Sequence, residues 1–136
     1  MKKIIAILFS MSLLTADATI VRVKGSNLMW EDTTHSEETK VTFMEAKSYC
    51  RDLKLGRYSD WRLPTLQELL SIVNYKRYKP AIINGFSHVN RDTLYWSKTP
   101  YIKESDEYWG VNFKDGSSSN AAINYDRYVR CVRDIK

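Results

Sequence analysis

Short runs of alternating apolar and polar residues predict strands at both ends of the chain. The first two runs flank a Gly25-Ser26-Asn27 turn, so they predict an antiparallel hairpin. Asp115-Gly116, with polar residues after it, predicts a turn and a loop before the last strand. The strand-like runs are TIVRVKG (19–25), NLMWED (27–32), TLYWSKT (93–99), EYWGVNF (107–113) and RYVRCVRDI (127–135).

From Thr42 the apolar spacing becomes helical. Thr42 and Glu45 form a capping box, and Gly56 lies where a left-handed residue ends a helix. The apolar stripe consists of Phe43, Ala46, Cys50 and Leu53. The opposite face carries a basic row, which is interpreted as a solvated surface or, alternatively, as ligand contacts: Lys47, Arg51 and Lys54.

A second helix is predicted after the sequence DWRLPT (60–65). Thr65 and Glu68 repeat the capping-box spacing, and Pro64 holds the entering chain extended. Trp61 is interpreted as a core or edge anchor for the link between the helices. Asp60 and Arg62 flank it, and we expect them to bond loop backbone or to pair with each other. The stripe of this helix is Leu66, Leu69, Leu70 and Val73.

The stretch KPAIINGFSHVNRD (79–92) has no sustained period and predicts a long loop. The expected order is therefore a hairpin, two helices, a long loop and several antiparallel strands. This is an α+β layout.

The N-terminus has the form of a secretory signal peptide. Lys2 and Lys3 precede an apolar run, and Ala16-Asp17-Ala18 is a small-x-small cleavage pattern. The apolar run is about half the length that a membrane span needs. We therefore expect a signal peptide at 1–18 and one exported domain at 19–136, without a transmembrane span after cleavage.

Charge and cysteine content narrow the class of protein. The net charge is +5, of which the predicted signal contributes +1, so residues 19–136 carry +4. This mild excess permits anionic partners, but it is not concentrated in one dense run, and nucleic acid is not an expected partner. Cys50 and Cys131 are the two cysteines of the sequence, and in an exported chain they are expected to form a disulfide.

Six segments, in order and spacing, resemble the bacterial Lcl C-terminal domain family, long catalogued as a domain of unknown function. The segments cover about residues 25–133: NLMWED, EAKSYCRDLKLGRYSDWRLPTLQELLSIV, PAI, YWSKTP, WGVNFKDG and YVRCVR. The resemblance implies a C-type-lectin-like fold, with two helices packed on small antiparallel sheets, and it supports the Cys50 to Cys131 bridge. It makes Trp61, Arg62, Pro64, Thr65 and Glu68 a structural signature. The adhesin domain that names the family is associated with sulfated glycosaminoglycans.

The motifs of several catalytic and metal-binding classes are absent from the sequence. It has no Glu-Pro-Asn, Gln-Pro-Asp or Trp-Asn-Asp tripeptide of the calcium-dependent lectins, and Glu104, Asp106 and Glu107 are interpreted as a solvated acidic tip. His35 and His88 lack metal-ligand spacing. No nucleophile, base and orienting group form a recognisable set, so we expect neither an enzyme, a metal site nor a cofactor.

Two hypotheses of function remain. The first is an exported, adhesin-like module, periplasmic or at the cell surface, that binds acidic glycans without calcium. Its candidate contacts are Lys76, Arg77, Tyr78, Lys79 and Arg127, with Tyr75 beside them and the basic row of the first helix as further possibilities. The second is a structural or protein-interaction module of the envelope. Its aromatic anchors would be Tyr95, Trp96, Tyr101, Tyr108 and Trp109, unless these fill the core.

Overall fold

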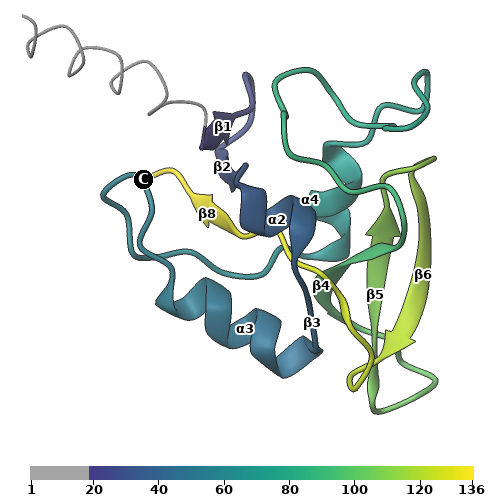
Figure 1. Ribbon diagram of the computed structural model, residues 1–136. Helices are drawn as coiled ribbons and strands as arrows, with labels where there is room; N and C mark the ends of the chain where they lie inside the picture. The colour runs from purple at the N-terminus through teal and green to yellow at the C-terminus, as the bar shows by residue number, and fades with distance from the viewer. Residues whose placement is uncertain (1–18) are drawn as a thin grey trace, which may run out of the picture.

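The computed structural model describes residues 19–136, and the predicted signal peptide lies outside the described residues. This part of the chain forms two sheets and three helices, so the predicted α+β class is confirmed (Figure 1). The smaller sheet is antiparallel with the order β1-β2-β8, and its first two strands are the predicted hairpin. Its strands are β1 (Ile20–Arg22), β2 (Leu28–Glu31) and β8 (Val132–Asp134).

The larger sheet has the order β3-β7-β4-β5-β6, with one parallel pairing between β4 and β7. Its strands are β3 (Lys40–Val41), β4 (Leu94–Pro100), β5 (Glu107–Asn112), β6 (Ser117–Ala122) and β7 (Arg127–Tyr128). The predicted loop after Gly116 is wrong, because this segment is the edge strand β6, paired with β5 along its whole length. The predicted last strand is also divided, since β7 and β8 belong to different sheets.

Each of the three helices begins at a threonine that accepts a backbone N–H in a capping box. They are α2 (Thr34–Glu38), α3 (Phe43–Asp52) and α4 (Leu66–Ser71). The two capping boxes predicted for α3 and α4 are confirmed, whereas the single turn α2 was not predicted. The predicted role of Gly56 is wrong: α3 ends at Asp52 because Leu53 is extended, and Gly56, with φ +62°, forms the later turn between Leu55 and Tyr58.

Two apolar clusters form the core. One contains the buried residues of α3 together with Trp61, Leu63 and Trp96; the other contains Leu69 of α4 and Tyr95. The predicted disulfide is confirmed, with 5.5 Å between the Cα atoms of Cys50 and Cys131. It joins α3 to the segment between β7 and β8.

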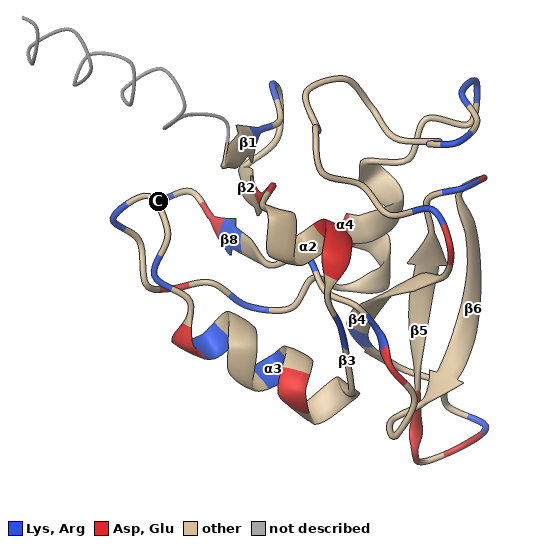
Figure 2. Cartoon of the chain, viewed as in Figure 1, with Lys and Arg blue, Asp and Glu red and all other residues tan. Residues whose placement is uncertain are grey.

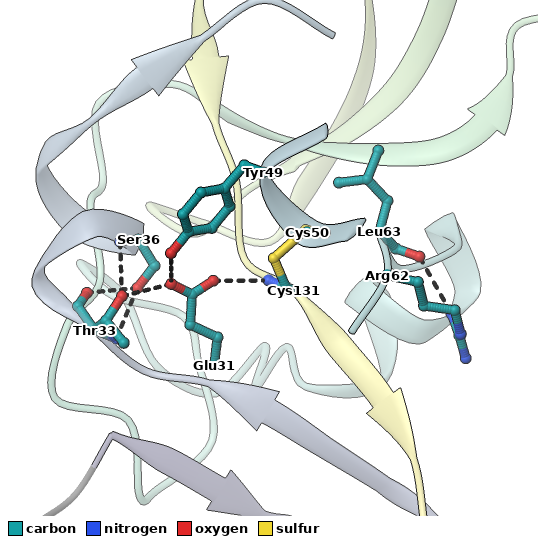
Figure 3. The surroundings of a disulfide bond; sticks show 8 residues. All are labelled: Glu31, Thr33, Ser36, Tyr49, Cys50, Arg62, Leu63 and Cys131. Atoms are coloured by element: carbon teal, nitrogen blue, oxygen red, sulfur yellow. Dashed lines mark hydrogen bonds between the residues drawn. A yellow bond between two sulfur atoms is a disulfide. The ribbon is translucent and has the colours of Figure 1, made fainter. Parts of the chain in front are cut away.

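The buried carboxylate of Glu31 lies near this disulfide, together with half-buried polar side chains (Figure 3). The Glu31 carboxylate accepts hydrogen bonds from the Cys131 N–H at 3.0 Å, the Tyr49 hydroxyl at 2.6 Å and the Thr33 hydroxyl at 2.5 Å. Burial and the adjacent Glu31 carboxylate raise the pKa of the Tyr49 phenol. Because Glu31 is fully buried, these three donors are what satisfies its carboxylate.

Candidate functional site

The loop after α4 presents five consecutive exposed residues, 75–79. The side-chain oxygen of Asn74 accepts the Lys76 N–H at 2.9 Å, and the backbone carbonyl of Asn74 accepts the Arg77 N–H at 3.1 Å. These two hydrogen bonds close a tight turn. The turn projects Tyr75, 69% exposed, and Tyr78, 62% exposed, with Lys76 and Arg77 between them. Local hydrogen bonds thus fix the backbone of a turn whose aromatic and cationic side chains are exposed to solvent.

Tertiary contacts add cations from two other segments to this loop. The Lys79 N–H donates to the Lys114 carbonyl at 2.9 Å, and the Arg91 guanidinium donates to the Lys79 carbonyl at 2.8 Å. A hollow of about 420 Å³ is lined by Lys79, Arg91, Lys114 and one acid, Asp92. We call the following five residues the basic cluster: Lys76, Arg77, Lys79, Arg91 and Lys114.

The cations of the basic cluster are available to a ligand. Among residues 19–136, none of the five forms an ion pair with a carboxylate. Arg77 instead donates to the Asn84 side-chain oxygen at 2.6 Å, and the Lys79 ammonium lies 5.6 Å from the centre of the Tyr78 ring. Figure 2 shows cationic segments on this loop and at the end of the β5–β6 hairpin.

Arg127 does not belong to the basic cluster. It lies on β7, paired with Val41 of β3, and its guanidinium is 5.4 Å from the Tyr125 ring. In Figure 1 the loop after α4 lies at the upper right, whereas β3 lies in the lower centre. Of the four basic candidates, the structure therefore brings together Lys76, Arg77 and Lys79.

The basic row predicted for the first helix is divided between two hollows, and its last member, Lys54, lies beyond the end of α3. Lys47 and Arg51 line a cleft beside Trp61, while Lys54 lines a more open depression on the other side of the helix. Arg51 also faces Asp52 at 3.1 Å in an exposed ion pair, and such pairs contribute little to stability.

The signature residues are held by ion pairs that the sequence did not predict. Arg62 pairs with Glu68 and Asp134, each at 2.9 Å, and the Glu68 carboxylate also accepts the Thr65 N–H at 2.8 Å. Burial raises the pKa of Glu68, but these donors outweigh it, so the pKa lies below its usual value.

Asp60 pairs with Arg133 at 2.6 Å, and this partner lowers its pKa to about 2. Of the two alternatives expected for these residues, the pairing of Asp60 with Arg62 is wrong, because both are held by the C-terminal segment. The bond to loop backbone is confirmed for Arg62, whose guanidinium donates to the Leu63 carbonyl at 3.2 Å. Trp61 is 3% exposed, as expected for a core anchor.

The aromatic residues proposed to dock a protein do not form one exposed face. Tyr95 and Trp96 are fully buried. Tyr95 donates to the Ser36 carbonyl at 2.6 Å, and the Trp96 indole donates to the Val41 carbonyl at 2.9 Å. Tyr101, Tyr108 and Trp109 are half-buried. The core accounts for Tyr95 and Trp96.

Sequence reasoning missed two members of the basic cluster and a buried ion pair. Lys114 follows a predicted strand and precedes the Asp115-Gly116 turn, so its exposure had a local signal, whereas nothing local connects Arg91 to Lys79. Arg130 and Asp32 are both fully buried and lie 3.3 Å apart. Asp32 also accepts the N–H groups of Ser87 and His88, each at 2.9 Å, so this pair anchors the long loop.

No helix within residues 19–136 is long and apolar enough to cross a lipid bilayer. No curated protein gives a significant match to the chain. Residues 19–133 match the sequence model of the Lcl C-terminal domain, which covers nearly all of the described residues. The chain therefore belongs to the Lcl C-terminal domain family.

Proposed function

We propose that this protein is an exported, non-enzymatic module that binds sulfated or otherwise acidic glycans without calcium. The observation that carries the proposal is the basic cluster, in which cations from three separate segments meet beside the exposed rings of Tyr75 and Tyr78. Cationic side chains donate charge-assisted hydrogen bonds to sulfate and carboxylate groups. Exposed tyrosine rings offer flat surfaces on which sugar rings can stack.

The disulfide bond supports the proposal that the protein is exported. Disulfides persist mainly in oxidising compartments, and the Cys50 to Cys131 bridge is buried in the core. We also propose a C-type-lectin-like fold, supported by two capped helices packed on small sheets and by a disulfide that joins α3 to the end of the chain. The periplasm and the cell surface are the two candidate locations.

Heparin binding tests the proposal. We expect the oxidised domain to bind heparin at low salt and to release it as the salt concentration rises, because exposed charges are screened. The variant K76Q/K79Q/K114Q keeps polar side chains at these positions and removes three charges. We expect it to raise the Kd for a heparin oligosaccharide at least tenfold, which corresponds to about 1.4 kcal/mol.

A matched control removes the same number of charges elsewhere. Lys24, Lys40 and Lys103 are exposed and lie outside the basic cluster, so K24Q/K40Q/K103Q has the same net charge as the test variant. We expect this control to bind heparin within about twofold of the unsubstituted protein. Equal losses in both triple variants would contradict a localised site, and absence of binding to heparin and to a glycan array would favour the envelope-protein partner instead.

A further inference from the structure

A second cleft lies on the opposite side of the molecule from the basic cluster. It has a volume of about 390 Å³ and is bordered by α3, by the link that follows it and by Lys98 of β4. The Lys98 N–H donates to the Pro64 carbonyl at 2.8 Å, which fixes β4 against the link. In Figure 1, α3 lies at the lower left and the loop after α4 at the upper right. The two regions therefore cannot contact one small ligand together.

Four cations line the cleft, and two of them have no carboxylate partner among residues 19–136. Lys47 and Lys98 form no ion pair there, and Arg51 is held by an exposed pair alone. Arg62 is fixed by its two acidic partners. The one acid of the lining, Asp60, is already engaged by Arg133. The walls therefore present an excess of positive charge that the protein itself does not neutralise.

The floor of the cleft is apolar. Trp61 and Leu63 line it and are 3% and 4% exposed. The indole Nε1 of Trp61 is buried and has no hydrogen-bond partner within residues 19–136. Because Trp61 lines the cleft, its indole N–H signal can report on what binds there.

We propose that this cleft is a second binding site, for a small organic anion with an apolar body. The anionic group lies between Lys47 and Lys98, and the apolar body rests on Trp61 and Leu63. The volume is at the lower end of the range of roughly 300–1,000 Å³ that is usual for small-ligand pockets. The site is independent of the basic cluster, so either can fail without the other.

The test compares two dyes that differ in charge. The probe is 8-anilinonaphthalene-1-sulfonate, and its neutral analogue is N-phenyl-1-naphthylamine, which lacks the sulfonate. The protein has four tryptophans, and the variant W61F identifies the Trp61 indole signal in an amide correlation spectrum by its disappearance. We expect the sulfonate to shift the Trp61 signal saturably and to bind at least tenfold more tightly than the neutral dye.

Charge variants locate the anionic group. We expect K47Q/K98Q to raise the Kd of the sulfonate at least tenfold, while K24Q/K40Q, which removes two exposed charges outside the cleft and outside the basic cluster, changes it less than twofold. Lys47 and Lys98 are exposed, so their variants should fold. A Trp61 signal that does not respond, equal affinity for the two dyes, or equal losses in the two double variants would each overturn the proposal.

Discussion

Replacing the buried Arg130 with methionine tests whether one ion pair holds the long loop to the core. The fully buried guanidinium donates to the Glu31 carbonyl at 2.6 Å, to the Asp32 carboxylate at 3.3 Å and to the His88 carbonyl. It also lies 4.8 Å from the centre of the Phe86 ring. Arg130 therefore joins β2 to the loop around residues 86–88.

The cost of R130M follows from what remains after the substitution. Methionine fills much of the volume, but the Asp32 carboxylate stays fully buried with two backbone N–H donors and no cation. Removing one partner of a buried pair typically costs about 3–5 kcal/mol. Because the total stability of a domain is about 5–15 kcal/mol, this loss would be a large fraction of it.

Urea unfolding of the oxidised protein measures this loss. With a slope of about 1–3 kcal/mol per molar urea, we expect the R130M midpoint to fall by about 2 M. The control R51M removes an arginine whose side chain is 71% exposed, and it should change the free energy of unfolding by less than about 0.5 kcal/mol. If R130M costs less than about 1 kcal/mol, Asp32 does not depend on Arg130 and the reasoning is refuted.

Three further variants test the disulfide, the β4–β5 contact and the ion pair between Asp60 and Arg133. The variant C50A/C131A opens a loop with a sequence separation of 81 and should lose about 4 kcal/mol in urea unfolding in the chain-entropy model; a loss below about 1 kcal/mol would contradict it. G110A places a Cβ 2.6 Å from a backbone carbonyl oxygen of β4, so we expect a lower melting temperature; an unchanged one would contradict the tight β4–β5 contact. Arg133 depresses the pKa of Asp60 to about 2, so their pair stabilises the fold above about pH 4 and loses this effect as the pH falls towards 2. The free energy of unfolding of D60N should therefore depend less on pH in that interval, and identical profiles would argue against the pair.

Local signals predicted the starts of α3 and α4 because a helix start depends on neighbouring residues. The capping boxes at Thr42 and Thr65 depend on side chains three positions apart, and the structure contains both. Strand β6 escaped prediction for the opposite reason. Its residues, SSSNAA, lack an apolar alternation because it is an edge strand with exposed serines, and its pairing with β5 supplies the structure.

The prediction of one last strand over residues 127–135 is wrong where the chain is buried on both sides. In YVRCVR, Val129 and Cys131 belong to one apolar cluster and Tyr128 and Val132 to the other, so the segment runs between the two cores. A polar residue in such a segment is expected to face water, yet Arg130 is enclosed because Asp32 compensates its charge. Asp32 is 98 residues away from Arg130 in the sequence, and no local pattern predicts that the two residues pair.

Contacts between residues far apart in the sequence also explain why the sequence predicted only part of each candidate site. The basic cluster combines a local run with Arg91 and Lys114, which only tertiary hydrogen bonds bring to Lys79. Its side chains are exposed and must be ordered on binding, at a cost of about 0.5–1.5 kcal/mol each. We therefore expect binding there to depend steeply on salt and weakly on the exact shape of the ligand.

The cleft beside Trp61 rests on firmer support, because the signature DWRLPT builds both the frame and the wall. Trp61 forms the floor, Arg62 is a wall residue fixed by two carboxylates, and the Pro64 carbonyl holds the strand that carries Lys98. Sites supported by such fixed residues discriminate shape better than sites on loops. The contacts that start α4 therefore also shape the cleft, and under the proposal of a second site we expect selectivity for one organic anion over another there rather than at the basic cluster.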